Sequence, residues 1–243
     1  LLSIKNLSIQ FNQDGVLSNA VINNSFDVAA GELVAIVGES GSGKSVTALS
    51  VLQLLPKQAV INGEILFGQD EPVDLLKLSH KKINSIRGNK IAMIFQEPMT
   101  SLNPVFTCGY QVMEAIQLHQ KVNKETARQK TIELFEKVKL PEPANLLSRY
   151  PHELSGGQKQ RVMIAMAMSC NPTILIADEP TTALDVTVQK TILELIKSLQ
   201  AQNNMGVIFI THDLGVVADI ADKILVMRKG EIVEQGLTKD ILH

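Results

Sequence analysis

The stretch from Val34 to Leu49 places the strongest constraint on how this chain folds. A short run of apolar, largely β-branched residues ends at Gly38, and residues 38–45 then match the pattern G-x-x-x-x-G-K-[ST]. Apolar residues recur after this pattern at helical spacing. A strand, a glycine-rich loop and a helix form an arrangement in which backbone N–H groups and the helix dipole bind phosphate. The sequence therefore predicts a nucleotide-binding loop rather than an ordinary glycine turn.

Two side chains of this loop carry the expected chemistry. We expect Lys44 to reach the β- and γ-phosphates of a nucleotide and the Ser45 hydroxyl to ligate Mg²⁺. The other loop residues are expected to surround the phosphates with backbone N–H groups and small side chains. They are Gly38, Ser40, Gly41, Ser42, Gly43 and Val46.

Composition limits the classes of protein to which the chain can belong. Its 243 residues are 45% hydrophobic and 20% charged, which is enough to bury a sizeable core. A net charge of -2 gives no electrostatic footprint for nucleic acid, so we expect no nucleic-acid partner. Cys108 and Cys170 match no metal-binding spacing and are expected to be reduced, buried thiols. Apolar runs stay shorter than the ~18 residues that a membrane span requires.

The order of the predicted elements favours an α/β fold. Residues 1–37 are predicted to form strands, and further strands are expected near residues 61–68, 91–95, 173–177 and 207–210, with helices between them. Residues 73–89 are expected to be a basic, solvated helix. Residues 107–148 have helical periodicity and no strand pattern, which indicates an inserted α-helical subdomain. We therefore predict a P-loop core with a mostly parallel sheet, an N-terminal antiparallel β portion and this helical insertion.

An acidic pair follows the most β-like run of the chain, residues 173–177. Asp178 is expected to hold Mg²⁺ directly or through water, and Glu179 to orient and deprotonate an attacking water molecule. The pair lies about 130 residues after the glycine loop, a separation that a parallel sheet can bring alongside it. Another strand, residues 91–95, delivers Gln96 at its end.

A second candidate anion site opens the helix after residue 154. Ser155, Gly156, Gly157 and Gln158 combine a hydroxyl, exposed N–H groups and the positive end of a helix dipole. The alternative is purely structural, because a serine at this position caps a helix in any protein.

Two anion sites in this order give the chain its resemblance to the ABC ATPases. The resemblance covers nearly the whole chain: P-loop 38–45, Q-loop Gln96, signature 154–158, Walker B 174–179, D-loop 183–185 and switch His212. It implies that two nucleotide-binding domains pair head to tail around ATP. Ser155 and Gly157 would then act on the partner's nucleotide, and Asp185 would follow the dimer interface.

The resemblance also implies roles for three residues that carry little signal alone. His212 would contact the γ-phosphate, although a histidine at a strand end can equally bond a backbone carbonyl. Gln96 would sense the metal and the water. Phe11 matches the aromatic residue that stacks on adenine in the family, although a lone aromatic residue is usually core.

Two stretches are similar to the ATPase subunits of bacterial dipeptide, oligopeptide and nickel importers. These are residues 38–47 and residues 96–104, which directly follow the Q-loop strand. In that family the helical subdomain and Q-loop receive separate transmembrane permease subunits, and an extracytoplasmic binding protein delivers the substrate. The resemblance thus implies a peripheral position on the cytoplasmic face of the bacterial inner membrane. The identity of the substrate is not expected to be encoded in this chain.

Other kinds of P-loop protein fit the sequence less well. Chromosome and repair ATPases insert long coiled coils between P-loop and signature, whereas here about 110 residues intervene without sustained heptads. Ribosome-associated ABC ATPases remain the alternative, and GTPases or kinases lack a signature run. We expect one nucleotide-binding domain over 1–243, with its core in 1–96 and 158–243 and a helical signature subdomain in 97–157. The family usually continues into a C-terminal extension, so we expect a trimmed chain or one half of a double ATPase.

Overall fold

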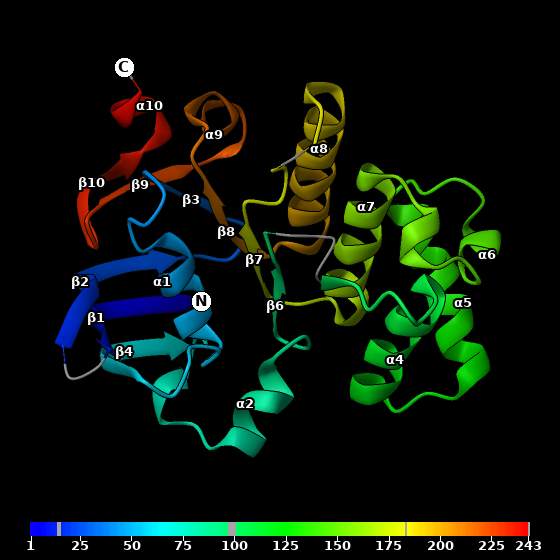
Figure 1. Cartoon of the computed structure of the whole chain (residues 1–243), viewed down its shortest axis with the longest axis horizontal. Helices are drawn as coiled ribbons and strands as arrows, with labels where there is room; N and C mark the ends of the chain where they lie inside the picture. The colour runs from blue at the N-terminus through cyan, green and yellow to red at the C-terminus, as the bar shows by residue number, and fades with distance from the viewer. Residues whose placement is uncertain (14–15, 97–100, 183, 243) are drawn as a thin grey trace. The chain divides into compact units, whose positions relative to one another are not determined.

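The structure is a computed structural model that describes residues 1–13, 16–96, 101–182 and 184–242 (Figure 1). It divides into two compact units. Unit 1 comprises Leu1–Asn84 and Asn204–His243, and unit 2 comprises Ser85–Asn203.

An antiparallel sheet forms the N-terminal part of unit 1. Strand β1 pairs antiparallel with β2 on one side and with β4 on the other, and the sheet order is β2-β1-β4-β5. Buried residues alternate with exposed ones along the second half of β2, which is typical of a sheet with one face on the core. The strands are β1 (Leu2–Gln13), β2 (Val16–Val28), β4 (Ala59–Phe67) and β5 (Val73–Asp74).

A mostly parallel group of strands forms the rest of unit 1. Strand β3 lies between β8 and β9 and is parallel to both, while β10 pairs antiparallel with β9. Every residue of β3 and β8 is buried, as expected for parallel strands covered on both faces. The elements are β3 (Leu33–Val37), α1 (Lys44–Val51), β8 (Gly206–Thr211), α9 (Leu214–Ile220), β9 (Lys223–Arg228), β10 (Glu231–Leu237) and α10 (Thr238–Ile241).

The buried side chain of Asn24 connects the two groups of strands in unit 1. Its Nδ2 donates a hydrogen bond to the Gly230 carbonyl at 3.0 Å, and its Oδ1 accepts one from the Ile232 N–H at 2.8 Å. The N–H of Ile22 also donates to the Gly230 carbonyl. These bonds satisfy a buried amide and fix the β9–β10 hairpin against β2.

Unit 2 contains a parallel strand pair and a set of helices. Strands β6 (Ile91–Ile94) and β7 (Ile174–Asp178) are parallel, and all five residues of β7 are buried. The Arg161 guanidinium donates to the Val138 carbonyl at 2.6 Å and to Thr191 Oγ1 at 3.2 Å, which fixes α7 against the end of α5 and against α8. The helices are α4 (Cys108–Gln120), α5 (Lys124–Lys137), α6 (Pro143–Leu146), α7 (Gly156–Ala167) and α8 (Val186–Asn203), with 3₁₀ turns η2 (Pro151–Glu153) and η3 (Met168–Cys170).

The expected single helix over 73–89 is wrong. Residues 73–74 form β5, Leu75–Lys77 form the 3₁₀ turn η1, and only His80–Ile86 form a helix, α2, which crosses the boundary between the units. Asp74 explains the break, because its Oδ1 accepts hydrogen bonds from the N–H groups of Leu76 and Ile65. The first bond caps η1 and the second holds the turn on β4.

The predicted fold class is confirmed. The chain combines an antiparallel N-terminal sheet, parallel strand pairs and a helical stretch between β6 and β7. Within the described ranges, none of the helices has the length and apolar character needed to span a bilayer.

Candidate nucleotide-binding and catalytic site

Gly38 and Gly43 stand where no side chain fits. A Cβ on Gly38 would lie 2.2 Å from the Met227 carbonyl oxygen, and one on Gly43 would lie 2.5 Å from the Ala20 carbonyl oxygen. Gly43 also has a φ of 100°, which an L-residue rarely adopts. The loop is therefore packed directly against backbone of β9 and β2. The requirement for glycine at positions 38 and 43 follows from these contacts.

The polar groups of the loop suit an anionic ligand. The Lys44 ammonium donates to the Gly38 carbonyl at 2.7 Å and to the Glu39 carbonyl at 2.9 Å, which places it inside the loop. The Ser42 hydroxyl is buried and has no hydrogen-bond partner within the described ranges. Helix α1 begins at Lys44 with Gly43 as N-cap, so no capping side chain bonds its first N–H groups. A cation, a buried hydroxyl and an uncapped helix start fit a polyphosphate.

His212 and the loop emerge at the same edge of unit 1. Val37 pairs with Thr211 in the parallel register of β3 and β8, so Gly38 and His212 each follow directly after paired residues. The His212 side chain is exposed. Phe11 is half-buried on β1, opposite Ser18 and Ala59, and its stacking on adenine stays a prediction.

In unit 2, the ends of β6 and β7 bring together two of the predicted catalytic residues. Ile94 pairs with Ala177, so Gln96 and the acidic pair leave the same edge of the parallel strands. Gln96 Nε2 donates a hydrogen bond to Glu179 Oε2 at 3.1 Å, across 83 positions of sequence. Asp178 ends β7 and is 5% exposed. The fold thus joins Gln96 and Glu179 by a hydrogen bond, a contact that the sequence did not predict.

Glu179 has an unusual backbone conformation. Its φ is 46°, in the left-handed region that non-glycine residues occupy mainly in turns and functional sites. The Thr182 hydroxyl donates to Glu179 Oε2 at 2.9 Å, and the Thr182 N–H donates to the Glu179 carbonyl at 3.2 Å. No sequence motif marks Thr182. The only available signal was a hydroxyl residue three positions after a candidate base.

The signature segment adopts the structural arrangement that was considered as the alternative to anion binding. Ser155 Oγ accepts from the Gln158 N–H at 3.3 Å, and Gln158 Oε1 accepts from the Ser155 N–H at 3.0 Å. The two residues form a capping box at the start of α7. Ser155 and Gly156 are exposed, so the same end of the helix is open to a ligand. Capping and anion binding are compatible here.

Close packing explains the second signature glycine. A Cβ on Gly157 would lie 2.9 Å from Val188 Cγ1 on α8, whereas one on Gly156 would lie 3.4 Å from Leu184. Asp185 Oδ1 accepts from the Val188 N–H at 2.9 Å, at the start of α8. Thus the D-loop segment and the signature helix are neighbours within unit 2. Ala183 of the predicted D-loop lies outside the described residues, as do residues 97–100 of the importer-like stretch.

The candidate magnesium ligands are oxygen atoms, as this ion requires. Ser45 at the start of α1 supplies a hydroxyl, Asp178 a buried carboxylate and Gln96 an amide oxygen. Within the part of the chain that the structure describes, no three His, Cys, Asp or Glu residues cluster as metal ligands. Ser45 belongs to unit 1, whereas Asp178 and Gln96 belong to unit 2, and each supplies the oxygen type that Mg²⁺ uses together with phosphate oxygens.

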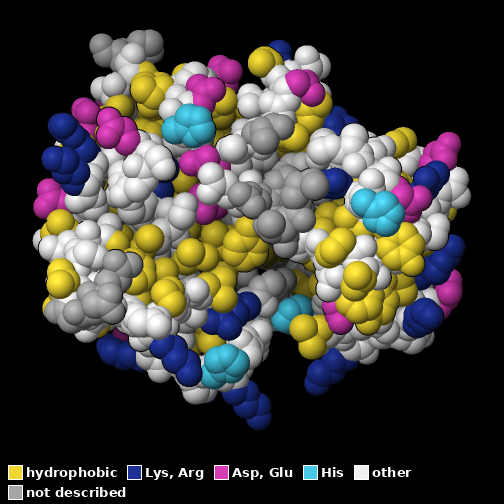
Figure 2. All heavy atoms as spheres, viewed as in Figure 1, with side chains coloured by type: hydrophobic (Ala, Val, Ile, Leu, Met, Phe, Trp, Pro, Cys, Tyr) yellow, Lys and Arg dark blue, Asp and Glu magenta, His cyan; other side chains and the backbone are white. Residues whose placement is uncertain are grey.

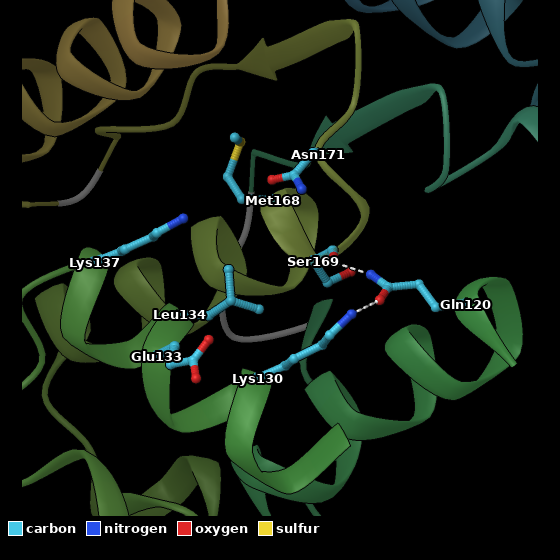
Figure 3. A pocket seen from close by; sticks show the side chains of 8 residues that line it. All are labelled: Gln120, Lys130, Glu133, Leu134, Lys137, Met168, Ser169 and Asn171. Carbon is cyan, nitrogen blue, oxygen red and sulfur yellow. Dashed lines mark hydrogen bonds between the residues drawn. The ribbon is translucent and has the colours of Figure 1, made fainter. Parts of the chain in front are cut away.

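A separate pocket of about 140 Å³ lies among the helices of unit 2 (Figure 3). Lys130 of α5 donates to Gln120 Oε1, and Gln120 Nε2 donates to the Ser169 carbonyl at 2.8 Å. The bridge joins α4 and α5 to η3. None of the predicted site residues is among those that line this pocket, which are Gln120, Lys130, Glu133, Leu134, Lys137, Met168, Ser169 and Asn171.

The strand–loop–helix at β3 and the paired acidic and amide residues at β6 and β7 define a P-loop nucleotide-binding domain. The family model described as ABC transporter matches residues 21–182, and the chain belongs to this family. It is therefore an ABC ATPase domain.

Alignments with named relatives include the whole of this chain. Glutathione import ATP-binding protein GsiA of Salmonella choleraesuis (strain SC-B67) is 54% identical over 247 aligned residues, and that of Escherichia coli (strain K12) is 53% identical. Both alignments include 100% of this chain but 40% of the relative. The chain thus spans two fifths of the length of these curated relatives.

Solved structures share the fold. The ATP-binding cassette MJ0796, a dimer in a post-hydrolysis state bound to ADP and Pi, superposes with a TM-score of 0.86 at 28% identity, over 98% of this chain and 99% of that one. The protein cbiO1 from Clostridium perfringens, part of the ABC transporter complex cbiONQ, gives 0.80 at 27% identity, over 99% and 90%.

Proposed function

We propose that this chain is the ATP-binding and hydrolysing motor domain of an ABC importer for peptide-like substrates or nickel. The observation that carries the hydrolytic role is the hydrogen bond from Gln96 to Glu179 at the edge formed by β6 and β7. The names of the 53–54% identical relatives support an importer rather than a nucleic-acid or ribosome-associated ATPase. Glutathione is a tripeptide, so these names favour a short peptide as substrate over nickel.

The residues of the P-loop would bind the triphosphate. The backbone N–H groups of residues 38–46 surround the phosphates, and Lys44 exchanges its bonds to the Gly38 and Glu39 carbonyls for bonds to phosphate oxygens. Phe11 stacks on the adenine. Magnesium, held by Ser45, Asp178 and Gln96 with the phosphates, would neutralise charge that develops on the β- and γ-oxygens.

Glu179 would act as the general base for hydrolysis. Its carboxylate accepts a proton from the attacking water, whose oxygen bonds to the γ-phosphorus as the bond to the β-γ bridging oxygen breaks. Gln96 orients this carboxylate and senses the metal and water, and His212 contacts the γ-phosphate. Ser155, Gly156, Gly157 and Gln158 of a second domain approach the same phosphates, and Asp185 follows the interface between the two domains.

The proposed partner subunits of this chain would bind the surface of unit 2. Val105, Phe106, Tyr110 and Tyr150 are large, exposed side chains, and the rings of Phe106 and Tyr110 stack with centroids 5.0 Å apart. Hydrophobic side chains gather on the surface over the helices of this unit (Figure 2). Such a surface on the helical part of unit 2 suits the transmembrane permease subunits, with which an extracytoplasmic binding protein exchanges substrate. The chain would then sit peripherally on the cytoplasmic face of the bacterial inner membrane.

The proposal is tested by ATP turnover and binding with two variants. Glu179→Gln should lower the rate of phosphate release at least ~100-fold, because the base is removed, while ATP affinity is kept. Lys44→Ala should lose ATP affinity. Glu194→Gln, an exposed glutamate on α8, is the matched control and should hydrolyse ATP like the parent protein. Full turnover by Glu179→Gln would remove Glu179 from the role of base, and unchanged binding by Lys44→Ala would exclude the phosphate-binding role of the loop.

A further inference from the structure

We propose that Thr182 is a positioning residue that holds the carboxylate of Glu179 in place for proton abstraction. The inference rests on the proposed function, because it gives Thr182 a task only if Glu179 activates water. Thr182 is three residues beyond Glu179 and bonds it twice. Its hydroxyl donates to Glu179 Oε2 at 2.9 Å, and its N–H donates to the Glu179 carbonyl at 3.2 Å.

The turn that carries Thr182 is firmly anchored in unit 2. Pro180 is buried and Thr181 is 7% exposed, and the Thr181 carbonyl accepts a hydrogen bond from Gln189 Nε2 of α8 at 3.2 Å. Thr182 itself is half-buried. The Thr182 hydroxyl therefore contacts Glu179 from a turn that a hydrogen bond from α8 holds in place.

Gln96 and Thr182 contact the same atom but from different surroundings. Both donate to Glu179 Oε2, Gln96 at 3.1 Å and Thr182 at 2.9 Å. Gln96 is exposed, so water competes for its bond, whereas the Thr182 bond is local and partly shielded. We infer that Thr182 orients the carboxylate and Gln96 adds a second donor to it.

The backbone conformation of Glu179 is the reason why its carboxylate needs support from a neighbouring residue. Its φ of 46° places the residue in the left-handed region, which persists in folded proteins only where neighbouring contacts enforce it. The Thr182 N–H closes the turn, and the hydroxyl fixes the side chain that leaves it. Without the hydroxyl, the carboxylate would sample other rotamers, and the geometry for attacking water would form less often.

Thr182 should therefore affect turnover rather than nucleotide binding. Thr182→Val keeps the shape of the side chain but removes the donor, and should lower kcat about 10- to 100-fold while KM for ATP changes less than about twofold. Thr182→Ser restores the hydroxyl and should retain kcat within about threefold. The matched control is Thr173→Val, because the Thr173 hydroxyl donates to the Lys90 carbonyl at 3.0 Å, at the opposite end of β7. It should match the parent protein.

The Glu179→Gln background separates this inference from the proposed function. If Thr182 acts through Glu179, adding Thr182→Val to Glu179→Gln should lower the residual rate no further. Parent-like kcat in Thr182→Val, equal losses in Thr182→Val and Thr182→Ser, or a further loss in the double variant would each overturn the role of Thr182 and leave the proposed function standing. Full turnover in Glu179→Gln would overturn both. Should Thr182→Val not fold, Thr182→Ala compared with Thr182→Ser makes the same test.

Discussion

At the scale of the residue, the glycines of the P-loop are required for two different physical reasons. Gly43 has a φ of 100°, and a Cβ added to it would lie 2.5 Å from the Ala20 carbonyl oxygen. Gly41 has a φ of 79°, but a Cβ added to it would have no atom within 4 Å. Gly43→Ala should therefore lower the free energy of unfolding by about 3–5 kcal/mol, through strain and overpacking together. Gly41→Ala should cost roughly 1–2 kcal/mol, through strain alone. Urea denaturation followed by circular dichroism measures both.

The comparison between these two glycines contains its own control. Equal losses in the two variants would mean that backbone conformation alone sets the requirement for glycine, and that the contact with the Ala20 carbonyl does not matter. A larger loss at Gly41 would contradict the loop geometry.

The two cysteines should differ in reactivity. Burial, with a smaller effect of the Glu153 charge, raises the pKa of the Cys108 thiol to about 11, so at pH 8 about one thiol in a thousand is ionised. Cys170 is half-buried. We expect iodoacetamide to alkylate Cys170 first and Cys108 only after unfolding, as mass spectrometry of the peptides would show. Modification of both thiols at one rate in the folded protein would contradict the burial of Cys108.

Residues that belong to a recognisable sequence pattern could be proposed as site residues from the sequence. Residues that matter through a hydrogen bond formed only in the fold could not. Lys44, Asp178 and Glu179 stand out because a strand end or a glycine pattern precedes them. Thr182 and Asn24 carry no such pattern, and their importance appears only when the fold brings an acceptor within hydrogen-bond distance. For Ser155 the sequence left capping and anion contact as alternatives, and only the geometry of α7 shows that the two are compatible.

At the scale of the element, most strands and helices were predicted because their apolar periodicity agrees with their burial. The expected helix over 73–89 failed because periodicity ignores local side-chain bonds to the backbone. Asp74 bonds the N–H groups of Leu76 and Ile65, which ends β5 and starts a separate 3₁₀ turn. One short polar side chain can therefore interrupt a stretch that helical periodicity predicts to be a single helix.

The role of Asp74 predicts a dependence of stability on pH. Burial acts to raise the pKa of Asp74, but bonds from Lys77, Ile65 and Leu76 outweigh it, and the pKa lies below the ordinary 3.8. The stabilisation is therefore complete above the ordinary pKa and is lost as the pH falls through the lowered one. Asp74→Asn should cost about 1–2 kcal/mol at pH 7, and this difference should shrink toward pH 3. Lys77 is 73% exposed and contributes little of this energy.

Urea denaturation of the parent protein and Asp74→Asn between pH 3 and pH 7 tests this dependence. The control is Asp70→Asn, which changes an exposed aspartate in the preceding turn and should leave stability unchanged. A difference between Asp74→Asn and the parent protein that stays constant over this range would show that the charge of Asp74 is unimportant for the fold.

At the scale of the whole molecule, the proposed mechanism needs two copies of the domain, because the P-loop and the signature helix serve different nucleotides. The MJ0796 structure with ADP and Pi is dimeric, which supports this arrangement for a related fold. In this chain the start of α7 is exposed at Ser155 and Gly156, so a phosphate of a partner-bound nucleotide can reach it. The dimer should therefore form when nucleotide is bound, and it should accumulate when the bound ATP is not hydrolysed.

The test of this dimer separates the two roles of Ser155. Glu179→Gln, which retains ATP, should change from monomer to dimer on addition of ATP, as measured by size-exclusion chromatography with light scattering. Ser155→Asp in that background keeps an N-cap acceptor, so stability should change by less than ~0.5 kcal/mol, but it places a negative charge where the partner's phosphate would bind. ATP should still bind the P-loop, and the dimer should not form. Dimerisation of the double variant at the same ATP concentration would exclude Ser155 from the contact across the interface and leave it only the capping of α7.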